Sequence, residues 1–404
     1  MTHIHRSVRA WAFAMLACAF LVGLFVAPGY LTARVQAQNA PSYIFDPTWP
    51  KQLPNNWKMG GVTGLAVDSN DDVWVLNRPN DTDDNEGRAG GSGPAGADCC
   101  ARPPSMIHID KNGSTIGSFA APQGHGMDVD SQGFVYIGSD TVRNYDPNTG
   151  QLVMELPRIA ERQPGGRGAN PADVAAFRAK YPPSTPMIIA GLEEIRLDEA
   201  AGEMYIAESY LGGRVMVWDL KTFAFKRGWG AYGKPLAQIS LNEADHDYTP
   251  NGPMPKDFAG HLTLNFARDG MVYAADRNAN RIQVTDKQGK YMNKEFILAP
   301  ETGFGGSTGG VAFSTDAQQR YLYISDLTNN HIWFLNREDG RIVGQIGNMG
   351  ENGGQWFGLH MIAVDTQGNI YTGEVFNGER VQRFVPADSE RGRRLAAAGL
   401  QPMS

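Results

Sequence analysis

The stretch GHGMDVDSQGFVYIGSD, residues 124–140, decides the fold because five similar stretches accompany it. Each has an alternating apolar strand, a turn with Asp or Gly, and a second strand rich in Val, Ile, Tyr and Trp, which predicts a β-hairpin. The other five begin at Val62, Leu192, His261, Thr308 and Leu359. Further strand-like pieces such as SMIHID, RVMVWDL and RIQVTD lie between the copies. Four short strands per unit are typical of a propeller blade, so the sequence predicts an all-β, six-bladed β-propeller.

The composition agrees with a single all-β domain. The 404 residues include 48 Gly and 24 Pro, and the chain lacks the long helical-period apolar stripes of a helical or Rossmann-type domain. One helix is expected in PADVAAFRAK, residues 171–180, within a long surface loop. We expect SYIFD, residues 42–46, to close the ring by pairing with RVQRFV, residues 380–385. The propeller would then span residues 38–386, and residues 387–404 would form a surface tail.

A targeting segment precedes this domain. Arg6 and Arg9 come before an apolar run over residues 11–26, and Val-Gln-Ala at residues 35–37 resembles a cleavage site. This pattern predicts a secretory signal peptide over residues 1–37, hence a secreted or periplasmic protein with no stable membrane association after its removal. An uncleaved membrane anchor is the alternative.

Charge and cysteine content restrict the partners and the crosslinks. Without residues 1–37, 33 Lys and Arg stand against 43 Asp and Glu, a net charge of −10. Nucleic acids and anionic membranes favour clustered Lys and Arg, so neither is expected as a partner. Cys99 and Cys100 are adjacent, and either a vicinal disulfide or two free thiols would leave distant parts of the chain unlinked. We expect a monomer stabilised by its β core.

Three histidines occupy the same position in alternate copies of the repeat: His125, His261 and His360. Because the innermost strand of a blade lines the central channel, all three should point toward the axis at one mouth. The odd-numbered copies have Thr63, Glu193 and Gly309 nearby. Three neutral imidazoles with an open fourth position are typical of catalytic zinc. The alternative is an ordinary half-buried histidine, the interpretation preferred for the histidines at positions 108, 246 and 331.

Over residues 62–384 the chain resembles the catalytic core of peptidyl-α-hydroxyglycine α-amidating lyase (peptidylamidoglycolate lyase), a six-bladed propeller related to the NHL-repeat proteins. GHGMDVD, GHLTLNF and GLHMIAVD place His125, His261 and His360 at the zinc ligands of that family. The resemblance also implies three catalytic residues, found in VWVLNR, ESYLGGRV and ADRNANRIQV: Arg78, Tyr210 and Arg277.

The chain departs from the family at two positions near the third histidine. Gly358 stands where the animal enzymes have a methionine, so the floor of the site differs. Met361 stands where the family has an aspartate that helps to bind a structural calcium. The resemblance therefore implies zinc, whereas the calcium site lacks one of its ligands.

The resemblance implies a zinc-dependent lyase that cleaves the C–N bond of an α-hydroxyglycine-type carbinolamide to an amide and glyoxylate. Tyr210 would be the base, with a pKa below its usual value, and Arg277, together with the zinc itself, would stabilise its phenolate. Arg78 would pair with the carboxylate of a small-molecule or peptide substrate. For both arginines the alternative is a rim ion pair with an acid such as Asp276 or Glu208. Two other functions stay open: a non-catalytic secreted propeller that binds a peptide or protein, and another metal-dependent propeller hydrolase.

Overall fold

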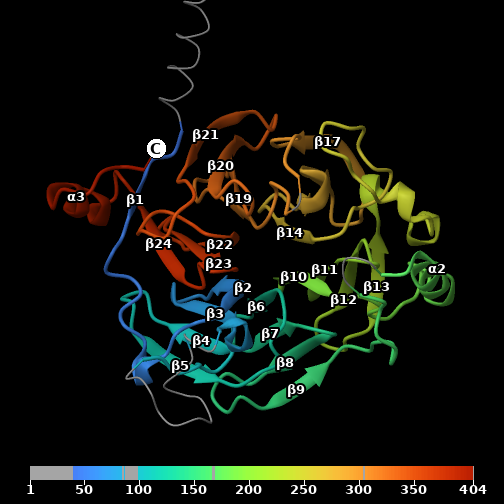
Figure 1. The fold of residues 1–404 in the computed structure, drawn as a ribbon, viewed down its shortest axis with the longest axis horizontal. Helices are drawn as coiled ribbons and strands as arrows, with labels where there is room; N and C mark the ends of the chain where they lie inside the picture. Colours follow the sequence, from blue (N-terminus) through green and yellow to red (C-terminus); the bar gives the residue numbers. More distant parts are fainter. Residues whose placement is uncertain (1–39, 84–85, 87–98, 166–168, 304, 404) are drawn as a thin grey trace, which may run out of the picture.

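The computed structural model describes residues 40–83, 86, 99–165, 169–303 and 305–403. Over these residues, six four-stranded antiparallel sheets stand in a ring around a central axis (Figure 1). The predicted six-bladed β-propeller is confirmed. The predicted signal peptide, residues 1–37, lies outside the described residues. Within the described part, no helix is long and apolar enough to cross a membrane.

The blades follow one another in chain order, and in each the first strand named below is innermost. Blade 1 contains β2 (Gly61–Val67), β3 (Val73–Arg78), β4 (Met106–Ile109) and β5 (Thr115–Phe119). Blade 2 contains β6 (Met127–Val129), β7 (Val135–Gly138), β8 (Val142–Tyr145) and β9 (Leu152–Glu155). Blade 3 contains β10 (Leu192–Asp198), β11 (Glu203–Glu208), β12 (Arg214–Asp219) and β13 (Phe225–Trp229).

The second half of the ring repeats this order. Blade 4 contains β14 (Leu262–Phe266), β15 (Val272–Asp276), β16 (Arg281–Thr285) and β17 (Tyr291–Ile297). Blade 5 contains β18 (Val311–Phe313), β19 (Tyr321–Asp326), β20 (His331–Asn336) and β21 (Ile342–Ile346). Blade 6 contains β22 (Leu359–Val364), β23 (Ile370–Glu374), β24 (Val381–Pro386) and, outermost, β1 (Tyr43–Phe45).

The ring is closed by a strand from the beginning of the domain. β1 pairs antiparallel with β24, so that Tyr43 lies opposite Pro386 and Phe45 opposite Phe384. The segment predicted to close the propeller does so, and its partner is the predicted one. Closure leaves the first and last segments of the domain side by side in one sheet and removes the open seam that an incomplete last blade would have.

The segment after Pro386 differs from the expected surface tail because it folds back on the closing strand. It forms α3 (Glu390–Ala397), whose Ser389 cap accepts a hydrogen bond from Gly392 N. Leu395 is buried in a cluster with Ile44 and Val385. An N-cap and one apolar side chain at the right phase are sufficient for a short helix to dock, and this signal was missed in the sequence.

The remaining helices lie in the loops (Figure 1). The predicted helix is confirmed as α2 (Pro171–Lys180), capped by Asn170, with Val174 and Phe177 buried. Its Arg178 side chain donates to the carbonyl of Leu211, which fixes the loop that carries Tyr210. Short 3-10 helices span Pro54–Asn56, Pro79–Asp81, Ala231–Gly233, Leu236–Gln238, Glu243–Asp245 and Arg277–Ala279.

The core lies between neighbouring blades. Val62 and Leu65 of β2, for example, share a buried cluster with Met361 of β22 and Tyr371 of β23, so blade 1 packs on blade 6 through apolar side chains. Outside the core, Cys99 and Cys100 form a vicinal disulfide, one of the two states considered for them. The blades therefore depend on apolar burial, and a crosslink between neighbouring residues cannot join them.

Candidate active site at one mouth of the central channel

The three predicted ligands lie at the start of the innermost strands of blades 2, 4 and 6. His125 precedes β6, His261 precedes β14, and His360 is the second residue of β22. A glycine before His125 is required, since a Cβ on Gly124 would lie 1.8 Å from the carbonyl oxygen of Gly138. His261 itself has φ 51°, a left-handed conformation that residues other than glycine adopt at an energetic cost.

β-bulges turn His360 and one further side chain, Glu193, to this mouth. The pairing register shifts at Glu193, between Leu192 and Glu194, and at His360, between Leu359 and Met361. A bulge adds one residue to a strand and re-aims its side chain. Glu193 therefore lies in blade 3 at the position that histidines occupy in the even-numbered blades.

Glu193 is the shared partner of two of the histidines. Its carboxylate Oε1 contacts His261 Nδ1, and its backbone carbonyl oxygen is 3.0 Å from His125 Nδ1. The same Oε1 lies 3.9 Å from Arg277 Nη2. With its side chain only 1% exposed, this carboxylate is surrounded by two imidazoles and a guanidinium. Glu193 stands at the right phase of the repeat in the sequence, but the repeat pattern does not indicate its role.

His360 completes the group from the opposite side of the channel. Its Nε2 lies 3.3 Å from Nε2 of His125, and the two rings meet edge to face at 73°. Its Nδ1 is buried and has no hydrogen-bond partner among the residues that the structure describes. A buried polar atom without a partner is uncommon, and it points to a missing ligand, water or proton partner.

Burial and neighbouring charges set the protonation of the group. Burial lowers the pKa of His125 to about 4 against the attraction of Glu193, while the positive charges of Arg78 and Arg277 add to the lowering. Burial likewise lowers the pKa of His360 well below its usual value. Burial alone would raise the pKa of Glu193, but His261, His125 and Arg277 hold it well below its usual range. The site thus combines neutral imidazoles with an ionised carboxylate.

These residues fit zinc by their donor atoms and their hydrogen bonds. With Nδ1 of His125 and His261 donating to Glu193, each ring keeps Nε2 available, which is the usual arrangement of metal-binding histidines. Two nitrogen ligands of tetrahedral zinc lie about 3.4 Å apart, and the His125–His360 separation is 3.3 Å. His261 has turned away toward Glu193, and the three imidazoles do not all lie within 4.8 Å of one another. A shift of His261 is therefore needed to complete the ligand set.

The two predicted arginines and the predicted tyrosine lie near the three histidines. Arg277 is 7% exposed at the side chain, whereas Arg78 lies on the rim with its Nε 2.7 Å from Asp81 Oδ2. The Tyr210 ring packs edge to face on His261 with a centroid separation of 4.8 Å. Asp276 and Glu208, the alternative partners considered for the arginines, instead pair with two other residues, Arg281 and Arg214.

The residues of the site do not by themselves produce the expected lowering of the Tyr210 pKa. Burial raises the pKa of Tyr210 to about 12, and the carboxylate of Glu193 acts in the same direction. Arg277 and Arg78 oppose this shift but do not reverse it. The phenol is therefore the stable form at neutral pH unless a further positive charge lies beside it.

The position of the family's calcium-binding aspartate is part of the apolar core here. Met361 is 3% exposed and shares its cluster with Val62, Leu65 and Tyr371. A thioether among apolar side chains is not a calcium ligand, because calcium binds oxygen atoms. Nothing in the structure at this position supports the family's structural calcium.

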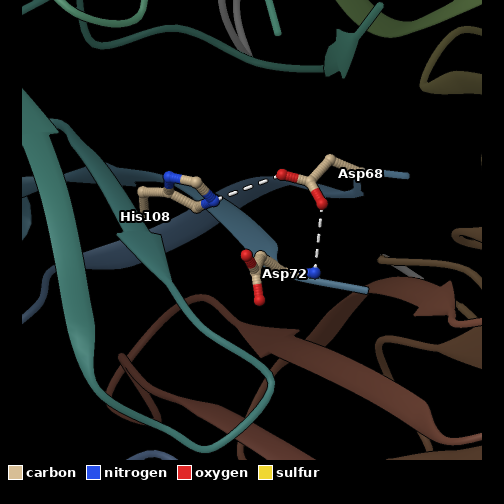
Figure 2. A group of neighbouring side chains, drawn as sticks. All are labelled: Asp68, Asp72 and His108. Atoms are coloured by element: carbon tan, nitrogen blue, oxygen red, sulfur yellow. Dashed lines mark hydrogen bonds and ion pairs between the residues drawn. The ribbon is translucent and has the colours of Figure 1, made fainter. Parts of the chain in front are cut away.

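A second group of metal-binding residue types lies in a turn of blade 1. Asp68, Asp72 and His108 are the only three His, Cys, Asp or Glu residues in the described part whose ligand atoms all lie within 4.8 Å of one another (Figure 2). Asp68 Oδ1 already accepts from the backbone N–H groups of Asn70 and Asp72. Its Oδ2 accepts from the indole of Trp74, on which His108 stacks. This group is a turn closed by its own hydrogen bonds.

The other two histidines also have local roles. His246 is buried, with its ring nitrogens 2.9 Å from the carbonyl of Phe258 and 3.0 Å from that of Ser240. His331 faces Asp326 at 3.9 Å and packs on Trp333. The interpretation of these residues as ordinary half-buried histidines agrees with these contacts.

Comparisons with known proteins support the fold alone. No protein-family model matches this chain, and no curated protein matches it in sequence. A structural-genomics protein of unknown function from Bacteroides thetaiotaomicron has 14% identity and a TM-score of 0.50, with 86% of this chain and 76% of that chain covered. At this identity the shared property is the propeller architecture.

Virginiamycin B lyase from Staphylococcus aureus is a more distant structural neighbour. A catalytically inactive variant with quinupristin has 11% identity and a TM-score of 0.44, covering 84% of this chain and 88% of that chain. The selenomethionine-substituted enzyme has 12% identity and the same TM-score, covering 81% and 86%. These values are too low to transfer an activity, so function must be argued from the site.

Proposed function

We propose that this protein is a zinc-dependent carbon–nitrogen lyase, similar to peptidylamidoglycolate lyase, that acts on a carbinolamide bearing a carboxylate. The observation that supports this proposal is that three histidines, two arginines and one tyrosine share one channel mouth with the buried Glu193. The resemblance named these six residues from distant segments; five of them interact with the buried carboxylate of Glu193, and Arg78 lies near enough to act on the charges of His125, His360 and Tyr210.

The reaction requires two proton movements and one bond cleavage. In R–CO–NH–CH(OH)–COO⁻ the hydroxyl loses its proton, and its oxygen forms the carbonyl of glyoxylate. The C–N bond breaks as its electron pair goes to nitrogen, which takes up a proton to give R–CO–NH₂. No water is consumed, so one residue that accepts and then returns a proton is sufficient.

Arg78 and Arg277 have different tasks in this proposal. Arg78 is half exposed on the rim, where it can exchange Asp81 for the carboxylate of an arriving substrate. Arg277 is buried beside Glu193, where its fixed charge favours the anionic form of Tyr210. The substrate is thereby held by its carboxylate with the hydroxyl carbon near the histidines.

Tyr210 is the residue proposed to move the proton. Its ring lies against His261, and its side chain is 43% exposed, so substrate can reach it. Zinc held by His125, His261 and His360 would supply the additional positive charge that lowers the pKa of a nearby hydroxyl. From a pKa of about 12, the phenol needs that charge to act as a base near neutral pH.

The test is glyoxylate release from a model peptide that ends in α-hydroxyglycine, with zinc content measured in the same sample. Turnover that is lost with chelator and restored by zinc supports the lyase. Stoichiometric zinc without turnover would contradict the proposed substrate class. Protein that binds no zinc would contradict the metal site and leave the binding propeller as the better interpretation.

A further inference from the structure

Glu193 links the histidines of the site to one another through two different oxygen atoms. Its main-chain carbonyl is 3.0 Å from Nδ1 of His125, and its side-chain Oε1 contacts Nδ1 of His261. Neither an amide carbonyl nor an ionised carboxylate can donate a hydrogen bond. Each imidazole must therefore carry a proton on Nδ1, and in the neutral ring this leaves Nε2 with a free lone pair.

We propose that Glu193 is a positioning residue that fixes the Nδ1–H tautomer of His125 and His261 and so prepares both Nε2 atoms to bind the metal. This inference rests on the proposed function for the identity of the metal. A histidine ligand needs its second ring nitrogen fixed in this way, and loss of the outer partner costs metal affinity. Here a single residue serves two ligands from two different blades.

The surroundings of Glu193 suit this role. Its side chain is 1% exposed, and Arg277 Nη2 lies 3.9 Å from Oε1. Its position in a bulge of β10 brings both its carbonyl and its carboxylate to the channel mouth. The second carboxylate oxygen, Oε2, is buried without a hydrogen-bond partner in the described part of the chain.

The neighbouring residue Glu194 provides a matched control. It is an equally buried glutamate on the same strand, 2% exposed, and its Oε1 pairs with Arg196 Nη1 at 3.1 Å, with no contact to the histidines. Exchange of Glu194 for glutamine changes an equally buried carboxyl group one position along the same strand and leaves the histidine contacts in place. An effect that only the Glu193 variants show is then due to the contacts of Glu193 rather than to the exchange of a buried carboxyl group on this strand.

The first readout is the tautomeric state of the histidine rings in metal-free protein, measured by long-range ¹⁵N–¹H correlation spectra. In the unmodified protein we expect Nδ1–H for both His125 and His261. In Glu193→Ala the His261 ring should lose this preference, while His125 should keep it because its acceptor is a backbone carbonyl. An unchanged His261 ring would overturn the proposal, and this readout depends on neither zinc nor turnover.

The second readout is the zinc dissociation constant, measured by competition with a chromophoric chelator. Loss of an outer hydrogen-bond partner typically weakens metal binding about 10–100-fold. We expect Glu193→Ala to show a loss in this range, Glu193→Gln a smaller one because its amide oxygen still accepts, and Glu194→Gln none. Equal affinities for the unmodified protein and Glu193→Ala would overturn the proposal. Absence of zinc binding by the unmodified protein would instead contradict the proposed function and leave the tautomers as the deciding result.

Discussion

Nε2 of His125 lies 3.3 Å from Nε2 of His360, although 235 positions separate the two residues in the sequence. The contact joins blades 2 and 6 at the channel mouth, where His360 is buried and His125 is half-buried. Two neutral imidazoles that face each other through ring nitrogens can share one proton or one cation. Metal binding is therefore the first property to test, and it should depend on the histidines before any other residue.

Exchange of His261 for alanine should abolish zinc binding and turnover together while the propeller stays folded. The ring is at the channel mouth, outside the packed interfaces between blades, so the expected loss of unfolding free energy is about 1–3 kcal/mol, from the buried Glu193 acceptor that loses its partner. Zinc content, glyoxylate release and circular dichroism measure metal binding, turnover and folding, respectively. Retention of stoichiometric zinc in this variant would show that His261 is not a ligand.

Exchange of Tyr210 for phenylalanine should separate chemistry from metal binding. The ring and its contact with His261 are kept, and only the hydroxyl is removed. Since a positioned general base typically contributes about 10²–10⁴-fold, kcat should fall by such a factor, with zinc content and thermal stability unchanged. Steady-state kinetics on metal-loaded protein provide the test. A variant that keeps full activity would remove the phenol from the mechanism.

Exchange of Arg78 for alanine should raise KM more than it lowers kcat. A charge-assisted hydrogen bond contributes about 1.5–3 kcal/mol, which corresponds to about 10–100-fold in KM. The matched control is Asp81→Asn, which frees Arg78 from its rim partner and should not raise KM. A fall in kcat at constant KM would place Arg78 in the chemical step instead of in substrate binding.

The buried Glu194 should make stability depend on pH between about pH 5 and 8. Burial raises its pKa to about 8, Asp128 and Glu193 act in the same direction, and Arg196 opposes them. Because the folded pKa lies above the unfolded value, the folded state holds the proton more tightly. The stability that this proton binding contributes is fully present below the pKa of Glu194 in the unfolded chain. It is lost as the pH rises through the pKa of Glu194 in the folded protein.

The comparison that isolates this effect is urea unfolding of the unmodified protein and Glu194→Gln over that range. The unmodified protein should lose up to about 1.4 kcal/mol per pH unit relative to the variant, because glutamine resembles the protonated acid and does not titrate. Parallel pH profiles for the two proteins would mean that Glu194 is ionised in the fold at neutral pH.

The helix after the propeller should stabilise the closing strand. Leu395 of α3 is 5% exposed and packs with Ile44 of β1 and Val385 of β24. Truncation of a buried leucine to alanine costs about 2–5 kcal/mol, and this peripheral site should lie near the lower value. Thermal unfolding of Leu395→Ala measures the loss, with the exposed Ala397→Ser as the control. Equal melting temperatures would mean that the helix rests on β1 without stabilising it.

Much of the fold was predictable because its signals are local. Each blade begins with a hairpin whose two strands are close in the sequence, so alternation and turn residues reveal it without knowledge of the rest. The closing strand around Ile44 and α2 (Pro171–Lys180) were predicted for the same reason. The packing of Leu395 was not predicted, because its partners Ile44 and Val385 lie on two strands that meet only when the ring closes.

The candidate site was predictable in its residue types but not in its contacts. The repeat phase identified His125, His261 and His360, and the resemblance added the arginines and Tyr210. Neither revealed that burial raises the pKa of Tyr210 to about 12 or that Arg78 pairs with Asp81. Burial and ion pairing depend on what surrounds a side chain in space, and a strand pattern does not contain that information.

The number of blades, and the phase at which each blade presents a residue to the channel, follow from short-range alternation and turn chemistry and can be read along the chain. That Glu193 contacts two histidines at once depends on the three-dimensional arrangement of the blades. Each of the two histidines lies 68 positions away in the chain, in a different blade. The three side chains meet because a β-bulge turns Glu193 toward the channel and because the closed ring places blades 2, 3 and 4 side by side around a common axis.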